Sequence, residues 1–305
     1  MDLRQLQTLV AVVDHGGFTA ASRALHTVQS IVSAHVARLE RELGATLIDR
    51  ATGSPTPQGE VVVGRARRIQ SELDAITTDV ASLQSEVTGP ARIGLIGTTA
   101  RWLVPPLVNE MSRRFPKVAV EVHDATTASL LLQLDSATID LAVLTLPVDD
   151  PEVSTEPLFV EDRIVAMPSD HPLARLDRIG LADLVGVPLI VEPRGRPFRD
   201  QLEAIFAERG WPLEVKAEVD GTRLVASLAF EGFGVAILPA SAVSARTDLD
   251  WRTVPIDGLP GRSVGLGTRR QGLLSAPSRA MREVLRDVIA ARAVDQPGIH
   301  PTAET

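Results

Sequence analysis

Two hydroxyl groups follow the strand predicted over residues 91–96, where the chain reads Gly97-Thr98-Thr99 ahead of a predicted helix. In doubly wound sheets, ligands bind at the carboxyl ends of strands, where the free N–H groups and dipole of the next helix favour anions. Thr98 and Thr99 are therefore the first candidates for binding a small anionic ligand, and helix capping is their alternative role. Equivalent strand ends give three further candidates: Thr145, Arg194 and Thr222. Arg101 and Trp102 could add charge or stacking.

The sequence motifs give little support to an enzymatic function. The stretch from Gly261 to Gly265 matches G-x-S-x-G, but that motif needs a strand before the serine and a helix after it. Here a Gly/Pro turn precedes Ser263 and a strand is predicted after it. A serine hydrolase is therefore the weakest alternative, and no enzyme activity is expected. Without cysteines, and with scattered histidines, we expect no metal site and no cofactor.

The net charge of −8 is unevenly distributed along the 305 residues. Residues 1–68 hold eight arginines against six acids, so this part carries +2 and the remainder carries −10. A weakly basic N-terminal part permits phosphate binding but does not demand it. No run of apolar residues approaches the roughly 18 needed to span a bilayer, and we expect no signal peptide. A cytoplasmic protein without membrane contact is expected.

Three short helices are predicted in the first 43 residues. The first covers residues 3–13, the second 20–25 with Thr19 as its N-cap, and the third ends near Leu43. Val32, Val36, Leu39 and Leu43 are expected to form the buried face of the third helix. A short helix, a tight turn and a helix with a polar second face form the helix-turn-helix pattern, although any small bundle fits too. Residues 47–57 are expected to form a hairpin or wing.

One long helix is predicted from Pro57 to Val87, and its apolar residues alternate in steps of four and three. That spacing is typical of a helix that pairs in a left-handed coiled coil. We therefore expect a second chain to pack here, in preference to a helix lying only on its own domain. The seam consists of Val62, Ala66, Ile69, Leu73, Ile76, Val80, Leu83 and Val87.

From Ala91 onward, predicted strands and helices alternate, which favours mainly parallel, doubly wound sheets in two lobes. Strands are expected over residues 91–96, 118–123, 140–144, 163–167, 188–191, 214–219, 234–238 and 263–268. Helices are expected over 102–115, 130–135, 198–209, 224–230 and 277–293. Lobe 1 is expected at about 91–162 and 265–294 and lobe 2 at about 163–264, and residues 295–305 are expected to form a flexible tail.

The first 68 residues resemble the LysR-type transcriptional regulators in many ordered positions, including Gly17-Phe18-Thr19-Ala20-Ala21-Ser22, Leu43-Gly44 and Thr56-Pro57-Gln58-Gly59. The resemblance implies a winged helix-turn-helix DNA-binding domain (1–58), a linker and dimerisation helix (59–88) and a two-lobed α/β effector-binding domain of periplasmic-binding-protein-like fold (91–294). A bilobed binding protein without DNA function is the alternative, but it leaves residues 1–87 unexplained.

The resemblance also implies roles for individual residues. The third helix would enter the major groove, with Gln29 reading bases, while Arg38 and Arg50 would bind phosphates. The full set of expected DNA contacts is Gln29, Ser30, Ser33, Ala34, His35, Arg38 and Arg50. The chain departs from the family in Ser30-Ile31 after the glutamine, and in a short wing with one charge. The expected partners are double-stranded DNA with an interrupted inverted repeat, RNA polymerase, a small-molecule effector, and further copies of the chain in a homodimer or homotetramer.

Overall fold

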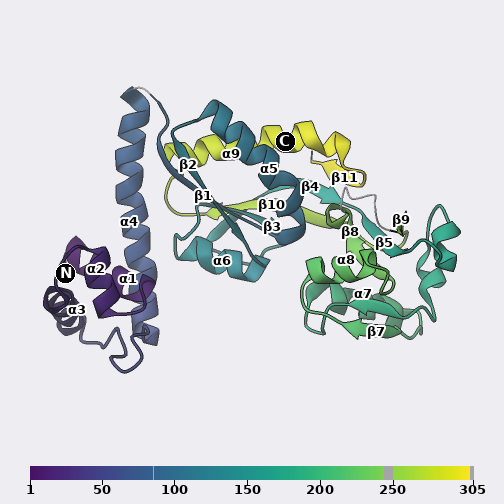
Figure 1. Cartoon of the computed structure of the whole chain (residues 1–305), viewed down its shortest axis with the longest axis horizontal. Helices are drawn as coiled ribbons and strands as arrows, with labels where there is room; N and C mark the ends of the chain where they lie inside the picture. Colours follow the sequence, from purple (N-terminus) through teal and green to yellow (C-terminus); the bar gives the residue numbers. More distant parts are fainter. Residues whose placement is uncertain (85, 244–249, 303–305) are drawn as a thin grey trace.

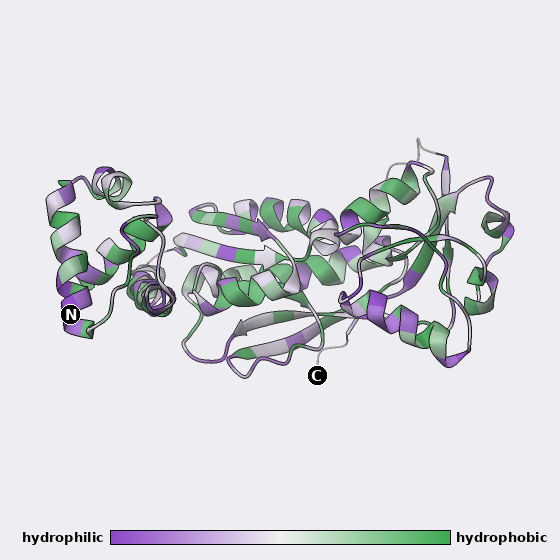
Figure 2. Cartoon of the chain, turned by 90° about the horizontal axis from the view of Figure 1, so that it is seen from below, coloured by the Kyte–Doolittle hydropathy of each residue, from purple (hydrophilic) through white to green (hydrophobic). Residues whose placement is uncertain are grey.

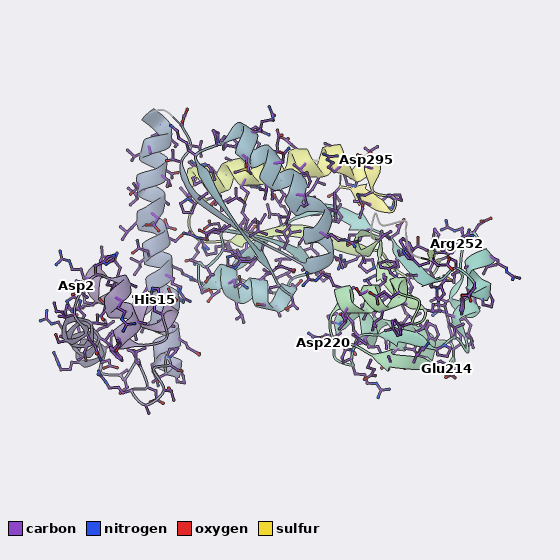
Figure 3. All side chains as sticks on the ribbon, in the orientation of Figure 1. Asp2, His15, Glu214, Asp220, Arg252 and Asp295 are labelled. Carbon is purple, nitrogen blue, oxygen red and sulfur yellow. The ribbon has the colours of Figure 1, made fainter. Side chains whose placement is uncertain are left out.

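The computed structural model describes residues 1–84, 86–243 and 250–302, and has three parts in a row. A small helical head lies at one end, helix α4 stands beside it, and two α/β lobes follow (Figure 1). Asp2 and His15 mark the head, while Glu214 and Arg252 mark the far lobe at the opposite end of the molecule (Figure 3). The head and the far lobe are thus separated by lobe 1.

The head contains α1 (Leu3–Asp14), α2 (Phe18–Ala24) and α3 (Gln29–Leu43), and an isolated bridge between Ile48 and Pro55 closes the short wing. Two local predictions were wrong. Helix α2 begins at Phe18 with Gly17 as its N-cap, so Thr19 lies inside the helix. Leu43 is 42% exposed, because the last turn of α3 extends beyond the core formed by Val32, Val36 and Leu39.

The linker helix α4 covers Pro57–Gln84, and the described residues after it, 86–88, are not helical. Its predicted seam has two different environments. Val63, next to the seam, and Ala66 are buried in the core of the head. Ile76 and Val80 are more than half exposed and Leu83 is 88% exposed. From Ile69 (40% exposed) to Leu83, the seam therefore presents exposed apolar residues to another chain, and this stretch is its exposed half.

Lobe 1 is a six-stranded sheet in the order β11-β4-β10-β3-β1-β2, with α5 and α9 on one face and α6 on the other (Figure 1). Hydrophobic residues run along its strands and helices (Figure 2). Its elements are β1 (Gly89–Leu95), α5 (Gly97–Arg114), β2 (Val118–Asp124), α6 (Thr127–Asp135), β3 (Leu141–Thr145), β4 (Val153–Glu161), β10 (Arg262–Arg269), α9 (Ala276–Arg292), η4 (Ala293–Asp295) and β11 (Ile299–Pro301).

Lobe 2 contains a three-stranded sheet, β8-β5-β9, and a parallel pair, β6-β7. Its elements are β5 (Arg163–Pro168), η1 (Pro172–Arg175), η2 (Leu181–Leu184), β6 (Leu189–Val191), α7 (Pro197–Glu208), β7 (Val215–Glu218), α8 (Thr222–Phe230), β8 (Ala236–Pro239), η3 (Ala240–Ala242) and β9 (Trp251–Pro255). The two-lobed α/β fold class is confirmed. The sheets are less parallel than predicted, because β4, β5, β8, β9, β10 and β11 all take part in antiparallel pairs.

Three strands escaped prediction: β4, β9 and β11. Strand β4 contains Pro157 next to a register irregularity against β10, and proline at a bulge weakens the strand pattern. The prediction of an irregular tail was wrong at Ile299–Pro301, where β11 pairs with β4 and buries Ile299. Residues 303–305 of that predicted tail lie outside the described residues.

Candidate functional site

Helix α3 presents a polar face away from the core of the head. Its buried residues Val32, Val36 and Leu39 fix the rotation of the helix. Four of the predicted DNA contacts are exposed as a result: Gln29, Ser30, Ala34 and Arg38. Side chains that project from one fixed helix face can reach base edges in a major groove, which is wide enough for an α-helix.

Ser33 and His35 are half-buried and already have partners inside the head. The Ser33 hydroxyl accepts a hydrogen bond from Nη1 of Arg50 at 3.3 Å. Nδ1 of His35 lies 3.1 Å from Oγ1 of Thr8 on α1. Both residues therefore hold α3 in place in this structure, and any contact with DNA would require a change of partner.

Arg50 at the base of the wing is held by three groups of the head. It pairs with Glu40 at 3.2 Å, and its guanidinium lies 5.2 Å from the centre of the Phe18 ring. Glu40 in turn accepts the backbone N–H groups of Leu47 and Ile48 at 2.9 and 3.3 Å. These contacts fix the start of the wing against α3, so that Arg50, still half exposed, is preorganised beside the polar face.

The first two effector candidates lie in the opening turn of a helix, and not in a loop as expected. Helix α5 begins at Gly97, which places Thr98 and Thr99 in its first turn, both buried. Oγ1 of Thr98 accepts a hydrogen bond from Nη2 of Arg262 at 2.7 Å. Oγ1 of Thr99 is buried without a partner among the described residues.

A cavity of about 270 Å³ lies between α5 of lobe 1 and α8 of lobe 2. Of the five predicted effector residues, only Thr98 lines it. Arg101 also lines it, and burial lowers the pKa of that guanidinium, which donates to the backbone carbonyls of Ser241 and Val243. The lining residues are Gly97, Thr98, Arg101, Arg223, Ala226, Ser227, Phe230, Glu231, Ala242 and Trp251.

Arg223 closes one side of this cavity by joining the two lobes. Its Nη1 lies 2.5 Å from Asp124 Oδ2 at the end of β2. Its side chain also passes so close to Gly97 that a Cβ at that position would lie 2.7 Å from Nε. A side chain at residue 97 would thus require Arg223 to shift. Sequence reasoning missed Arg223, although it directly follows the candidate Thr222.

The other three candidates lie outside the cavity lining, each with a local partner. The backbone N–H of Thr145 donates to Oγ1 of Thr127 at 3.2 Å. Arg194 is largely exposed and pairs with Glu203 at 3.1 Å. The Thr222 hydroxyl donates to Oε1 of Glu192 at 3.0 Å.

A buried ion pair lies where the chain passes between the lobes. Glu161 ends β4 and is fully buried, and Arg262 begins β10. The free oxygen of Glu161 accepts the N–H of Ser241 at 2.9 Å. Close by, burial lowers the pKa of Arg163 to about 10, and its guanidinium lies 3.8 Å from the centre of the Phe198 ring. Sequence reasoning missed this cluster because its members are far apart in the chain.

The hydrolase motif lacks the required geometry. Ser263 lies within β10, and the residues that follow continue the strand up to Arg269. A nucleophile elbow needs a strand-to-helix turn at the serine, so this match is a coincidence of sequence. In the part of the chain that the structure describes, every helix is too short or too polar to cross a membrane.

Comparison with known proteins covers nearly the whole chain. Residues 3–60 match the family described as "Bacterial regulatory helix-turn-helix protein, lysR family", and residues 84–290 match "LysR substrate binding domain". The "DNA-binding transcriptional dual regulator OxyR" of Escherichia coli is 32% identical over 297 residues, covering 96% of each chain. A probable hydrogen peroxide-inducible genes activator of Mycobacterium leprae is 33% identical over 298 residues, covering 93% of each chain.

Solved structures agree with this assignment. A full-length OxyR variant from Pseudomonas aeruginosa has a TM-score of 0.78 and 27% identity, covering 100% of this chain and 99% of its own. CbnR, a LysR family regulator solved with its target DNA, has a TM-score of 0.68 and 24% identity, covering 94% and 100%, and shares the fold. The chain therefore belongs to the LysR family, as a DNA-binding transcription regulator with an effector-binding domain.

Proposed function

We propose that two copies of this chain, or four, bind an interrupted inverted repeat in double-stranded DNA through α3 and respond to a small anionic effector between the lobes. The observation that carries the DNA proposal is the fixed outward face of α3, with Gln29, Ser30, Ala34 and Arg38 exposed. The relatives are transcription regulators, which supports a non-enzymatic role, in the cytoplasm and in contact with RNA polymerase.

Within this interface, Gln29 reads bases and Arg38 and Arg50 bind phosphates. An amide can bond adenine through two hydrogen bonds, whereas a guanidinium on a phosphate sets the register without reading sequence. Ser30 and Ala34 are exposed on α3 beside Arg38, whereas Ser33 and His35 reach DNA only by leaving their partners inside the head. The exposed half of the α4 seam supports pairing of two chains, because Ile76, Val80 and Leu83 are otherwise left in water. Pairing through α4 would set the separation of two heads and hence of two half-sites.

The effector switch uses non-covalent binding. Several relatives are hydrogen peroxide-inducible genes activators, but this chain contains no cysteine. Oxidation to a sulfenic acid or disulfide requires a thiol. We therefore expect hydrogen peroxide to leave the DNA footprint of this chain unchanged, and a peroxide-dependent footprint would contradict this switch.

The effector site lies between the lobes, around Thr98 and Thr99 at the N-terminus of α5. Oγ1 of Thr99, which is buried without a partner among the described residues, the helix N-terminus and the guanidinium of Arg101 in the cavity lining all favour an anion. Thr145, Arg194 and Thr222 complete the proposed set. A ligand here can act only by binding one arrangement of the lobes more tightly than another.

The DNA proposal is tested first on DNA upstream of the gene for this chain, with an excess of non-specific competitor. Gln29→Ala should weaken specific binding by about 1–3 kcal/mol and relax the choice of base at one position in each half-site. Specific binding that is identical for wild type and variant would show that Gln29 does not read bases.

The effector proposal is tested by thermal unfolding with benzoate and succinate as mono- and dicarboxylate probes. A carboxylate that binds between the lobes should raise the Tm of wild type but not of Arg101→Met, because binding to the folded state alone stabilises it. An equal rise in both proteins would place the anion elsewhere.

A further inference from the structure

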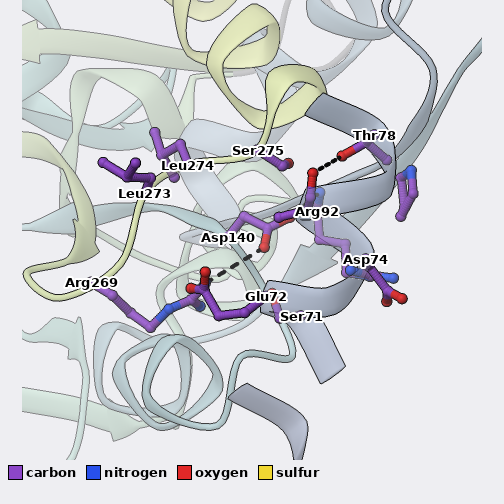
Figure 4. Close-up of a pocket in the computed structure, with 12 residues that line it drawn as sticks. Ser71, Glu72, Asp74, Thr78, Arg92, Asp140, Arg269, Leu273, Leu274 and Ser275 are labelled. Carbon is purple, nitrogen blue, oxygen red and sulfur yellow. Dashed lines mark hydrogen bonds and ion pairs between the residues drawn. The ribbon is translucent and has the colours of Figure 1, made fainter. Parts of the chain in front are cut away.

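The linker helix α4 has a polar face that lies against lobe 1 of its own chain. Arg68, Glu72 and Asp79 belong to this face, since positions four and eleven residues after Arg68 fall within about 40° of it around a helix. Figure 4 shows part of the contact between α4 and lobe 1, with Glu72 and Thr78 on α4 opposite Arg269 and Ser275 of lobe 1. The cavity between these residues has a volume of only about 20 Å³.

Asp79 caps a helix of lobe 1 from outside. Helix α9 begins at Ala276, and its own N-cap residue, Ser275, makes no side-chain capping bond. The backbone N–H of Ala276 instead donates to Oδ1 of Asp79 at 2.7 Å. Arg279 in the first turns of α9 approaches the same oxygen at 3.2 Å. The carboxylate thus meets the positive end of the α9 dipole, where an anion is favoured.

Arg68 makes the opposite contact with another helix. Helix α6 ends at Asp135, and Nε of Arg68 donates to the backbone carbonyl of Asp135 at 2.6 Å. The guanidinium also pairs with the carboxylate of Asp135. A cation is favoured at this end of a helix, because the last carbonyls are unpaired and carry the negative end of the dipole.

Two glycines of lobe 1 lie against side chains of α4 between these contacts. A Cβ at Gly89 would lie 2.5 Å from Cγ2 of Thr78, and a Cβ at Gly272 would lie 2.7 Å from Oε1 of Glu72. The exposed apolar residues Ile69, Ile76 and Val80 lie about a quarter turn away around the helix. One helix can therefore hold lobe 1 and a second chain at the same time.

We propose that Arg68 and Asp79 form a charge-based latch, which fixes the angle between α4, with the DNA-binding head, and lobe 1. Each residue bonds an end of a different lobe 1 helix, so both contacts are lost together when α4 turns away. The charged partners are partly exposed, at 21% and 58% for Arg68 and Asp135. Salt therefore weakens the latch. When both contacts are formed, a movement of lobe 1 also moves α4 and the DNA-binding head; when they are broken, it does not.

The absence of cysteine in the sequence allows a direct test with spin labels on the full chain. Gln58→Cys near the start of α4 and Asn109→Cys on α5 are both exposed and report the distance between helix and lobe. Labelled chains are diluted into unlabelled chains, so that an oligomer carries one labelled copy. The distance distribution is compared for wild type, Arg68→Ala/Asp79→Ala and the control Arg65→Ala, an exposed arginine of the same helix.

A latched helix gives wild type and Arg65→Ala the same narrow distribution, whereas the double variant is shifted or broadened. Asp79→Asn should stay closer to wild type than Asp79→Ala, because asparagine also caps helices. A double variant with native helix content and the wild-type distribution overturns the proposal. If the double variant does not fold, the distance distribution of the wild type is measured in concentrated NaCl instead. A broadened distribution supports the latch, and an unchanged distribution overturns it.

Discussion

Arg262 lies with its Nη2 2.5 Å from Oε1 of Glu161, and this ion pair joins the two places where the chain passes between the lobes. Glu161 has no exposed surface and Arg262 has 10% of its side chain exposed. The same Nη2 also donates to Thr98 at the wall of the interlobe cavity. The pair therefore connects the two interlobe crossings directly to the proposed effector site.

Removing either charge of this pair alone should lower the free energy of unfolding strongly. Glu161→Gln or Arg262→Met leaves a buried charge without its partner, which costs about 3–5 kcal/mol. Removing both charges should cost clearly less than the sum of the two single changes. Urea unfolding of the four proteins measures this difference, and additive single effects would contradict a direct interaction. Asp257→Asn, in the exposed pair with Arg178, serves as the control and should lower the free energy of unfolding far less than either buried single change.

A charge in the exposed half of the α4 seam should separate the chains. Ile76→Glu removes about 1.5–3 kcal/mol of apolar burial from each of two chains, so the dimer dissociation constant should rise at least ~100-fold. Sedimentation velocity over a concentration series measures the change. Val61→Glu is the matched control, because Val61 is also exposed on α4 but lies outside the seam. Equal dissociation of both variants would show that the seam is not the interface.

Arg38→Ala should change the salt dependence of DNA binding more than its sequence preference. Each lost phosphate contact lowers the slope of log K against log salt by about 0.9, so a complex with two heads loses about 1.8. Binding is measured across a salt series on specific and non-specific DNA. Arg252→Ala, at the opposite end of the molecule (Figure 3), should leave the slope unchanged. A variant that loses preference for one base but keeps the wild-type slope would assign Arg38 to base reading.

Glu156 should make lobe 1 sensitive to acid. Burial alone would raise its pKa, but the hydrogen bond from Arg282 and the charge of Arg286 outweigh burial and lower the pKa. A carboxyl whose pKa is lowered by folding stabilises the native state above its unfolded value of about 4.3, and this stabilisation is lost as pH falls below it. Glu156→Gln should therefore lower the free energy of unfolding by about 1 kcal/mol at pH 7 and by progressively less as the pH falls from about 4.3 toward 3. A cost that is constant over this range would rule out the ionised pair as its source.

Local pattern was sufficient for the elements that bind DNA. The spacing of Val32, Val36 and Leu39 set the buried face of α3, because a helix repeats every 3.6 residues, and this left Gln29 and Arg38 on the exposed face. The ordered motifs of the first 68 residues gave the family, and the alternation after Ala91 gave the two-lobed α/β class, both of which are confirmed. The individual DNA and effector contacts remain predictions.

Tertiary structure alone decided which distant residues meet. Asp79 and Ala276 are 197 residues apart, and Glu161 and Arg262 are 101 apart. No periodicity in a sequence encodes such contacts, since they depend on how complete elements pack. The heptad pattern likewise could not show that Ala66 is buried in the head while Ile76 remains exposed. Apolar spacing determines which face of a helix avoids water, but the surface that covers that face is chosen only when the domains assemble.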